Sequence, residues 1–186
     1  MKWWRKVLRL AALLIPLLSF VLSWNILITS VGILVLAMAA IELYRFSHPL
    51  FNTQLFLQCR SLFKRQERGR ISGIFWYLAS SFFILFFFEQ DIAIPALFFT
   101  TLGDGMANII GEKFGRKKIF HRSLEGSLAC LFFCLVAGLI LKNFLNITPL
   151  QILLGSITAT VVELFSIGMD DNLTMGILSA WVMSVV

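Results

Sequence analysis

A carboxylate and an amide, Asp104 and Asn108, lie four residues apart within an otherwise apolar segment of the sequence. A carboxylate in hydrocarbon is costly, so an acid inside a membrane span usually marks a functional site. A cluster of cations follows shortly afterwards: Lys113, Arg116, Lys117 and Lys118. Lys and Arg side chains bind phosphate through charge-assisted hydrogen bonds. These residues therefore predict a nucleotide or phosphate site at the edge of a membrane.

Further acids lie near the ends of later apolar segments. Glu163 falls about one turn from the end of one such segment, and Asp170, Asp171 and Asn172 precede the last one. Adjacent Asx residues before a helix can cap its free N–H groups, so capping and a role in the site are equally good interpretations. The depth of Glu163 in an apolar segment favours a functional role.

Two charged loops contribute more candidates. Ser123 is expected to cap the helix that follows it, and Glu125 in the first turn suits the positive end of the helix dipole. Arg65 and Glu67 lie in a longer loop, where a solvated surface is the default interpretation.

The composition indicates a membrane protein. The chain has 186 residues, of which 59% are hydrophobic, and its mean hydropathy is +0.87, far above that of a soluble domain. Crossing the hydrocarbon takes about 20 helical residues. We expect about seven crossings, at residues 7–23, 26–46, 73–88, 92–110, 124–141, 149–167 and 173–186. The predicted fold is therefore an all-α polytopic membrane protein, a single domain over residues 1–186.

The cations predict its orientation. With the N-terminus in the cytoplasm, Lys142 alone of the 16 Lys and Arg residues falls outside, as the positive-inside rule requires. Residues 48–72 form the longest inner loop, and Leu55, Cys59, Leu62 and Phe63 follow the spacing of an amphipathic surface helix. Cations facing anionic lipid explain the net charge of +6 without nucleic acid. We expect a bacterial cytoplasmic membrane, with the site on the cytoplasmic side.

Acids and cations that converge on one membrane face suit phosphoryl transfer. Mg²⁺ is usually held by one or two carboxylates together with substrate phosphates, and positioning and charge stabilisation then dominate catalysis. The sequence contains no Walker loop of the G-x-x-x-x-G-K-[ST] type. A nucleotide site in this chain would therefore not be a P-loop site.

The polar residues form an ordered set of motifs. They are Gly103-Asp104-x-x-Ala107-x-x-x-Gly111-x-x-Phe114-Gly115, Ser123-Leu124-Glu125-Gly126-Ser127, Glu163, and Asp170-Asp171-Asn172-Leu173. This set resembles the CTP-dependent lipid kinases, which comprise dolichol kinase, phytol kinase and yeast-type diacylglycerol kinase and are similar to phosphatidate cytidylyltransferases. The resemblance implies transfer of the γ-phosphate of CTP to a lipid hydroxyl with a divalent metal. Family members commonly have Lys where this chain has Arg122.

These patterns and the resemblance together predict the site. Asp104, Glu125, Glu163 and Asp171 are the expected catalytic residues. Asp104, Glu163 and Asp170 are the expected ligands of Mg²⁺ or another divalent cation. The expected nucleotide- and substrate-binding residues are Asn108, Lys113, Arg116, Lys117, Lys118, Arg122, Ser123, Asn172, Arg65 and Glu67.

Several alternatives stay open at this point. The acceptor is a lipid alcohol such as a polyprenol, phytol or diacylglycerol, and the donor is CTP or another nucleoside triphosphate. A cytidylyltransferase, in which the α-phosphate is attacked and pyrophosphate leaves, needs the same acids, metal and cations. A small transporter is a third possibility, although the polar positions crowd the inner half of the spans. The oligomeric state is left open.

Overall fold

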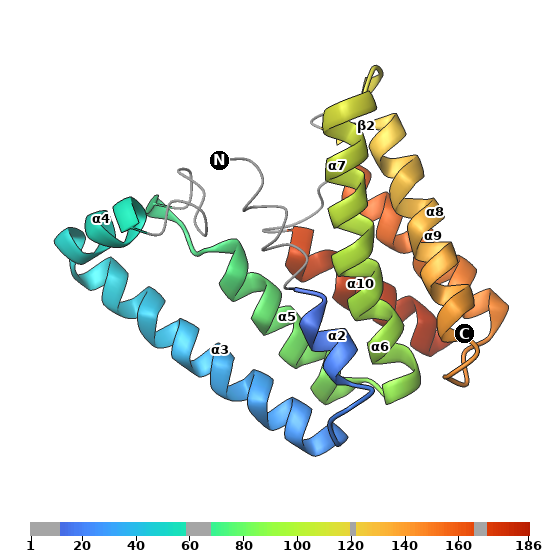
Figure 1. The fold of residues 1–186 in the computed structure, drawn as a ribbon, viewed down its shortest axis with the longest axis horizontal. Coiled ribbons are helices and arrows are strands. Elements are labelled where there is room, and N and C mark those ends of the chain that lie inside the picture. The colour runs from blue at the N-terminus through green and yellow to red at the C-terminus, as the bar shows by residue number, and fades with distance from the viewer. Residues whose placement is uncertain (1–11, 59–67, 120–121, 166–170) are drawn as a thin grey trace.

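The computed structural model describes residues 12–58, 68–119, 122–165 and 171–186, which are mainly helical (Figure 1). The helices are α2 (Leu14–Leu18), α3 (Trp24–Ser47), α4 (Pro49–Gln58), α5 (Gly73–Phe87), α6 (Gln90–Phe98), the π-helix η2 (Phe99–Gly103), α7 (Asp104–Phe114), α8 (Leu124–Leu141), α9 (Pro149–Phe165) and α10 (Asp171–Val185). The two short strands β1 (Lys118–Ile119) and β2 (Arg122–Ser123) pair antiparallel. The all-α prediction thus omitted only this small hairpin.

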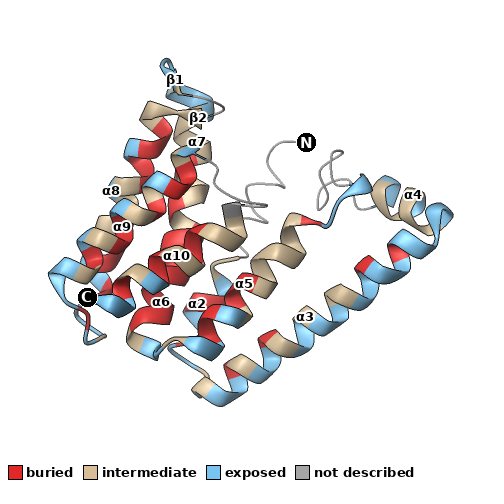
Figure 2. Ribbon diagram, turned by 180° about the vertical axis from the view of Figure 1, so that it is seen from behind, coloured by how far each residue is buried: buried red, intermediate tan, exposed pale blue. Residues whose placement is uncertain are grey.

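Helix α3 lies along one side of the molecule, where it packs against α5 (Figure 1). Leu27 and Val31, four residues apart, are buried on its inner face. The close approach depends on Gly32, because a Cβ atom there would lie 3.0 Å from the ring of Phe82. Most of the remaining surface of α3 is exposed (Figure 2). An apolar helix that is exposed in this way suits contact with lipid.

The core lies among α5 to α10, with α10 packed against α9, α5 and α6. Met175 and Met183 on α10 are fully buried, and the buried stretches of α6 and α10 face one another in this region (Figure 2). Gly176 permits this packing, since a Cβ atom there would lie 2.6 Å from Oγ1 of Thr100 and 2.7 Å from Cδ1 of Ile84. Small residues that let helices approach closely are typical of helix packing in membranes.

Helices α6, η2 and α7 form one continuous helix of 25 residues, Gln90–Phe114. Pro95 interrupts its hydrogen-bond ladder because proline has no backbone N–H. The π-helical turn follows, and the hydroxyl groups of Thr100 and Thr101 donate to the carbonyls of Ala96 and Leu97. Single π-turns often occur at functional sites. Here the π-turn ends at Gly103, directly before Asp104.

Three helices are long and apolar enough to cross a membrane: Trp24–Ser47, Gln90–Phe114 and Leu124–Leu141. The apolar helices Gly73–Phe87, Pro149–Phe165 and Asn172–Val185 are shorter. The structure therefore supports a helical membrane protein, while seven crossings are not confirmed.

The predicted first span differs from the structure. Residues 7–11 lie outside the described part of the chain, and after them α2 ends at Leu18 instead of continuing to Ser23. Ser19 turns its hydroxyl back to the carbonyl of Pro16 at 2.6 Å. The residues predicted to form an amphipathic surface helix are helical in α4 as far as Gln58, but no residue of α4 is buried, so an apolar face is not apparent there. Cys59, Leu62 and Phe63 lie outside the described residues.

A buried ion pair joins the end of α3 to the start of α5. Arg45 forms a salt bridge with Glu42 and donates to the carbonyl of Arg70 at 2.6 Å. Glu42 also accepts a hydrogen bond from the backbone N–H of Ser72 at 3.2 Å. Arg45 is completely buried. The two residues are three apart on α3, a spacing that brings their side chains together on one helix face.

Candidate functional site

The β hairpin positions the polar residues at the start of α8. Arg122 pairs with Ile119, and Ser123 pairs with Lys118. Ser123 caps α8 as predicted, because its hydroxyl accepts a hydrogen bond from the N–H of Gly126 at 3.2 Å. The hairpin therefore ends where α8 begins, and the side chain of Arg122 turns toward α7 and α9.

Glu125 supports this hairpin through the backbone. Its carboxylate oxygens accept from the backbone N–H of Lys117 at 3.2 and 3.4 Å. The N–H of Leu124 donates in turn to the carbonyl of Lys117 at 2.9 Å. Glu125 therefore supports the backbone next to the hairpin, whereas Asp104 and Glu163 contact the side chain of Arg122.

Glycines let α7 and α8 approach closely at the site. A Cβ atom on Gly126 would lie 2.8 Å from the carbonyl oxygen of Ala107. A Cβ atom on Gly111 would lie 2.7 Å from Oγ of Ser123. Real Cβ atoms almost never approach backbone atoms this closely, so a larger residue would separate the helices. Gly126 and Gly111 therefore belong to the scaffold that holds the site together.

Asp104, Asn108 and Arg122 form one polar cluster. The amide Nδ2 of Asn108 donates to Oδ1 of Asp104 at 2.7 Å, and Nη1 of Arg122 donates to Oδ1 of Asn108 at 2.9 Å. Nη2 of Arg122 lies 3.7 Å from Oδ1 of Asp104. Asp104 and Asn108 are four residues apart and so share one face of α7, and Arg122 joins them from the hairpin.

Glu163 joins the same cluster from α9. Its Oε1 lies 3.5 Å from Nε of Arg122, and its Oε2 accepts a hydrogen bond from the hydroxyl of Ser127 at 2.7 Å. The side chain of Glu163 is only 2% exposed. A carboxylate this deeply buried requires a charged partner and hydrogen bonds, which Arg122 and Ser127 provide.

The described acids can be tested against the needs of a divalent cation. No group of three His, Cys, Asp or Glu residues with suitable spacing occurs among the described residues. Mg²⁺ needs fewer protein ligands, since one or two carboxylates together with substrate phosphates are enough. Asp104 suits this role better than Glu163, because its side chain is 17% exposed and that of Glu163 only 2%. Both oxygens of Glu163 already have protein partners.

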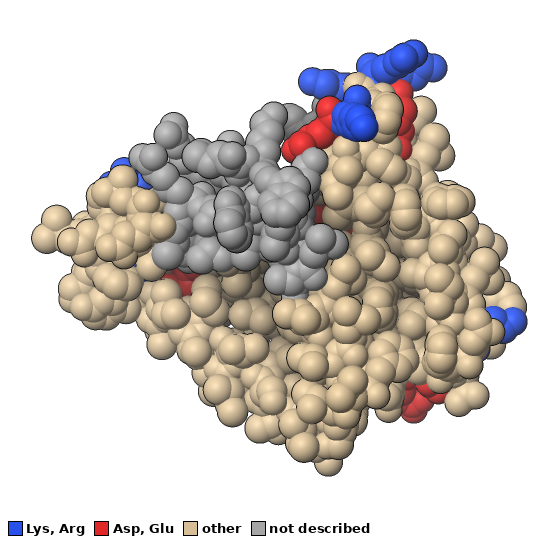
Figure 3. Space-filling model, viewed as in Figure 1, with Lys and Arg blue, Asp and Glu red and all other residues tan. Residues whose placement is uncertain are grey.

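The remaining predicted cations lie on the surface at this end of the bundle. Lys113, Arg116, Lys117 and Lys118 are exposed, and Figure 3 shows Lys and Arg gathered with acids at the end that carries the hairpin. Most of the described surface on this side carries neither. Among the described residues on this face, charge is therefore concentrated next to the buried cluster.

Some predicted residues cannot be placed. Asp170, Arg65 and Glu67 lie outside the described residues. The helix α10 begins at Asp171, with Asn172 in its first turn. Conversely, sequence reasoning missed Ser127 as a partner of Glu163, although its position four residues after Ser123 indicates the same face of α8.

The chain is similar to three proteins that are each named CTP-dependent diacylglycerol kinase 1. The protein from Saccharomyces cerevisiae is 25% identical, and the match covers 78% of this chain and 59% of the relative. The proteins from Eremothecium gossypii and Schizosaccharomyces pombe are each 24% identical, and each match covers 75% of this chain. The chain spans 52% of the Eremothecium protein and 71% of the Schizosaccharomyces protein.

No family model matches the chain, and no solved structure gives a significant match. The fold and the site define a helical membrane protein with a charged cluster at one end of its bundle. The similarity to the three relatives supports the resemblance to the CTP-dependent lipid kinases. These relatives are eukaryotic, so they give no support to the prediction of a bacterial membrane.

Proposed function

We propose that this protein transfers the γ-phosphate of CTP to the hydroxyl of a membrane lipid, and that this lipid is diacylglycerol. The names of the three relatives support the donor and the acceptor. The observation that carries the proposal is the position of Arg122, between Asp104 and Glu163, at the charged end of an apolar bundle. A lipid hydroxyl and a water-soluble nucleotide can meet only where the apolar bundle ends and the charged residues begin.

The cations bind the nucleotide in this proposal. The guanidinium of Arg122 has a planar fork of donors that matches phosphate oxygens. Lys113, Arg116, Lys117 and Lys118 add positive charge at the same end. Glu163 is 2% exposed and acts through Arg122 by fixing the position of its guanidinium. Glu163 is thus a positioning residue in this account, although we first expected it to bind metal.

The acids handle the metal and the proton. Asp104 holds a divalent cation, with Asp170 as the expected second ligand, and the cation when bound neutralises charge on the phosphates. The lipid hydroxyl oxygen attacks the γ-phosphorus, the bond from that phosphorus to the β–γ bridging oxygen breaks, and CDP leaves. A carboxylate accepts the hydroxyl proton, and Asp171 is the expected base. The site lies on the cytoplasmic side, as the cation distribution predicts.

Labelled CTP tests this function. Purified protein is mixed with diacylglycerol in detergent micelles, Mg²⁺, and CTP that carries a label on either the α- or the γ-phosphate. We expect the γ-label, and not the α-label, to appear in the lipid. Lipid that carries the α-label, with release of pyrophosphate, would instead show a cytidylyltransferase. Phytol and a polyprenol in parallel reactions test the choice of acceptor.

A further inference from the structure

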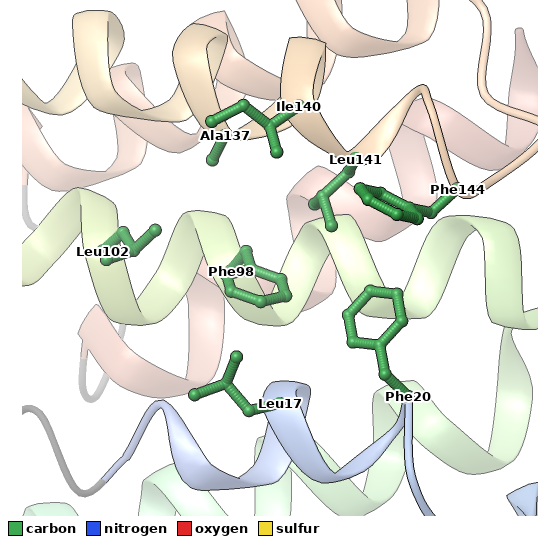
Figure 4. Close-up of a pocket in the computed structure, with 8 residues that line it drawn as sticks. All are labelled: Leu17, Phe20, Phe98, Leu102, Ala137, Ile140, Leu141 and Phe144. Carbon is green, nitrogen blue, oxygen red and sulfur yellow. The ribbon is translucent and has the colours of Figure 1, made fainter.

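An apolar pocket of about 460 Å³ lies between α2, the α6–η2 helix and α8. Its lining is Leu17, Phe20, Phe98, Leu102, Ala137, Ile140, Leu141 and Phe144 (Figure 4). Every one of these side chains is apolar, and Figure 4 shows them around a common space. Its volume is in the range of ligand-binding pockets. A polar ligand would find no hydrogen-bonding side chain in this lining, whereas an alkyl chain would be well solvated by it.

The pocket lies beside the candidate site on the same helix. Phe98 and Leu102 lie four residues apart in the same continuous helix as Asp104, and Gly105 lies three residues further on. A Cβ atom built on Gly105 meets no atom of the described residues within 4 Å. Among the described residues, the helix is therefore open at Gly105, directly beside Asp104. The distance along the axis from Phe98 to Asp104 is about 9 Å at 1.5 Å per residue.

Two aromatic rings lie at the other end of the pocket. Phe20 and Phe144 pack edge to face, with ring centroids 6.2 Å apart. Phe20 follows α2, and Phe144 follows the end of α8. This aromatic pair lies at the end of the pocket away from Asp104, because α8 runs from the site at Ser123 to its last residue at Leu141. The pair therefore marks where the lining of the pocket ends on this side.

We propose that this pocket holds one acyl chain of the lipid substrate and that the Phe20–Phe144 pair sets the preferred chain length. The proposal rests on the proposed function and names where its acceptor binds. The occupant is a substrate chain because the pocket lies on the helix that carries Asp104, with Leu102 in its lining two residues before that carboxylate, and the proposed function places the reacting hydroxyl at Asp104. A chain seated here would run from the hydroxyl away from the charged end, as the chain of a lipid in that leaflet does.

A binding experiment tests the pocket without any catalysis. A diacylglycerol with a diazirine at the end of one acyl chain is photolysed with the protein in phosphatidylcholine nanodiscs, and the labelled peptides are identified by mass spectrometry. We expect labels at Leu141 and Phe144, and loss of these labels when unlabelled diacylglycerol is added. Equal loss with extra phosphatidylcholine of the same chains would show ordinary bilayer lipid and overturn the proposal. Labels confined to α3 would do the same.

Substitutions test whether the pocket affects turnover. Ala137→Phe places a ring in the pocket, and Val136→Phe places the same ring on the neighbouring residue, which does not line it. We expect Ala137→Phe to raise the KM for diacylglycerol about tenfold or more, in the range that hydrophobic pockets achieve, with the KM for CTP unchanged. Equal effects of the two variants would contradict the proposal.

Chain-length preference provides the last measurement. Phe144→Ala removes one ring of the Phe20–Phe144 pair, and Phe132→Ala removes a ring of similar exposure on α8 that lies outside the pocket. We expect Phe144→Ala to shift the optimum of a saturated diacylglycerol series to longer chains, and Phe132→Ala to leave it in place. An unchanged optimum in both variants would overturn the role of the pair. If the unaltered protein phosphorylates no lipid, the proposed function fails, while the photolabelling still decides whether the pocket binds.

Discussion

Nε of Arg122 lies 3.5 Å from Oε1 of Glu163, so a residue of the β hairpin contacts a carboxylate that is buried in α9. The same guanidinium reaches Asn108 on α7 at 2.9 Å. Arg122 therefore ties three separate elements together at the charged end of the bundle. Glu163 and Asn108 fix the position of the planar guanidinium of Arg122. Its N–H donors are therefore already oriented before a phosphate binds, and such preorganisation is the condition for efficient charge stabilisation.

Removal of the charge on Glu163 should weaken nucleotide binding. Glu163→Gln keeps an oxygen that can accept from Ser127 but loses the attraction to Arg122. Hydrogen bonds to charged groups contribute about 1.5–3 kcal/mol, so we expect the KM for CTP to rise about tenfold to a hundredfold. Glu112→Gln, at an exposed acid of α7, provides the matched control. A KM for CTP that stays the same in Glu163→Gln would refute the positioning role.

Two glycines of the site should respond in opposite ways to alanine. Gly126→Ala places a methyl group 2.8 Å from the carbonyl of Ala107, whereas Gly105→Ala meets no described atom within 4 Å. Overpacking costs about 1–3 kcal/mol, while alanine in a helix is favoured over glycine by about 1 kcal/mol. Thermal unfolding in detergent should show a lower Tm for Gly126→Ala and an equal or higher Tm for Gly105→Ala. The reverse order would contradict the close helix crossing.

The ion pair between Glu42 and Arg45 should be essential for stability. Glu42→Gln leaves the fully buried guanidinium of Arg45 without its carboxylate. Breaking a buried pair from one side costs about 3–5 kcal/mol, so the Tm should fall clearly. Glu89→Gln, at an exposed acid, is the matched control and should leave the Tm unchanged. Equal Tm values for the two variants would show that the pair contributes little.

The orientation can be measured with reporter fusions. Fusions after residues 60, 90, 118 and 144 should report inside, outside, inside and outside, because Lys142 alone among the cations is expected outside. A cytoplasmic signal from the fusion after residue 90 would contradict this arrangement and would also place the charged cluster on the opposite side.

The local pattern of apolar residues in the sequence was sufficient to predict where several of the helices lie. The predicted span 124–141 agrees with α8, and the predicted span 26–46 differs from α3 by two residues at one end and one at the other. Long apolar runs with charged flanks fix such helices by themselves. The contact of Asp104 with Asn108 also follows from their spacing on one helix.

Contacts between distant segments could not be predicted in this way. Ser127 and Glu163 are 36 residues apart in the sequence, and their hydrogen bond depends on how α8 packs against α9. Arg122 was expected to bind nucleotide or substrate, but its contacts with Asn108 and Glu163 were not predicted. It turns inward because the hairpin reverses the chain just before α8. The π-turn at Phe99–Gly103 depends on packing as well, since its sequence has no distinctive pattern.

Asp104→Asn tests the central claim, that this cluster is the site of phosphoryl transfer. Asparagine keeps the size and the hydrogen-bonding oxygen of the side chain but removes the charge that a divalent cation needs. We expect the rate of lipid phosphorylation to fall about a hundredfold or more, while the Tm changes little, because the hydrogen bond from Asn108 can be kept and Arg122 lies 3.7 Å from the carboxylate, a long distance for an ion pair. Asp91→Asn, at the start of α6 and far from the cluster, is the control. A folded Asp104→Asn protein that phosphorylates lipid at a near-normal rate would contradict the account.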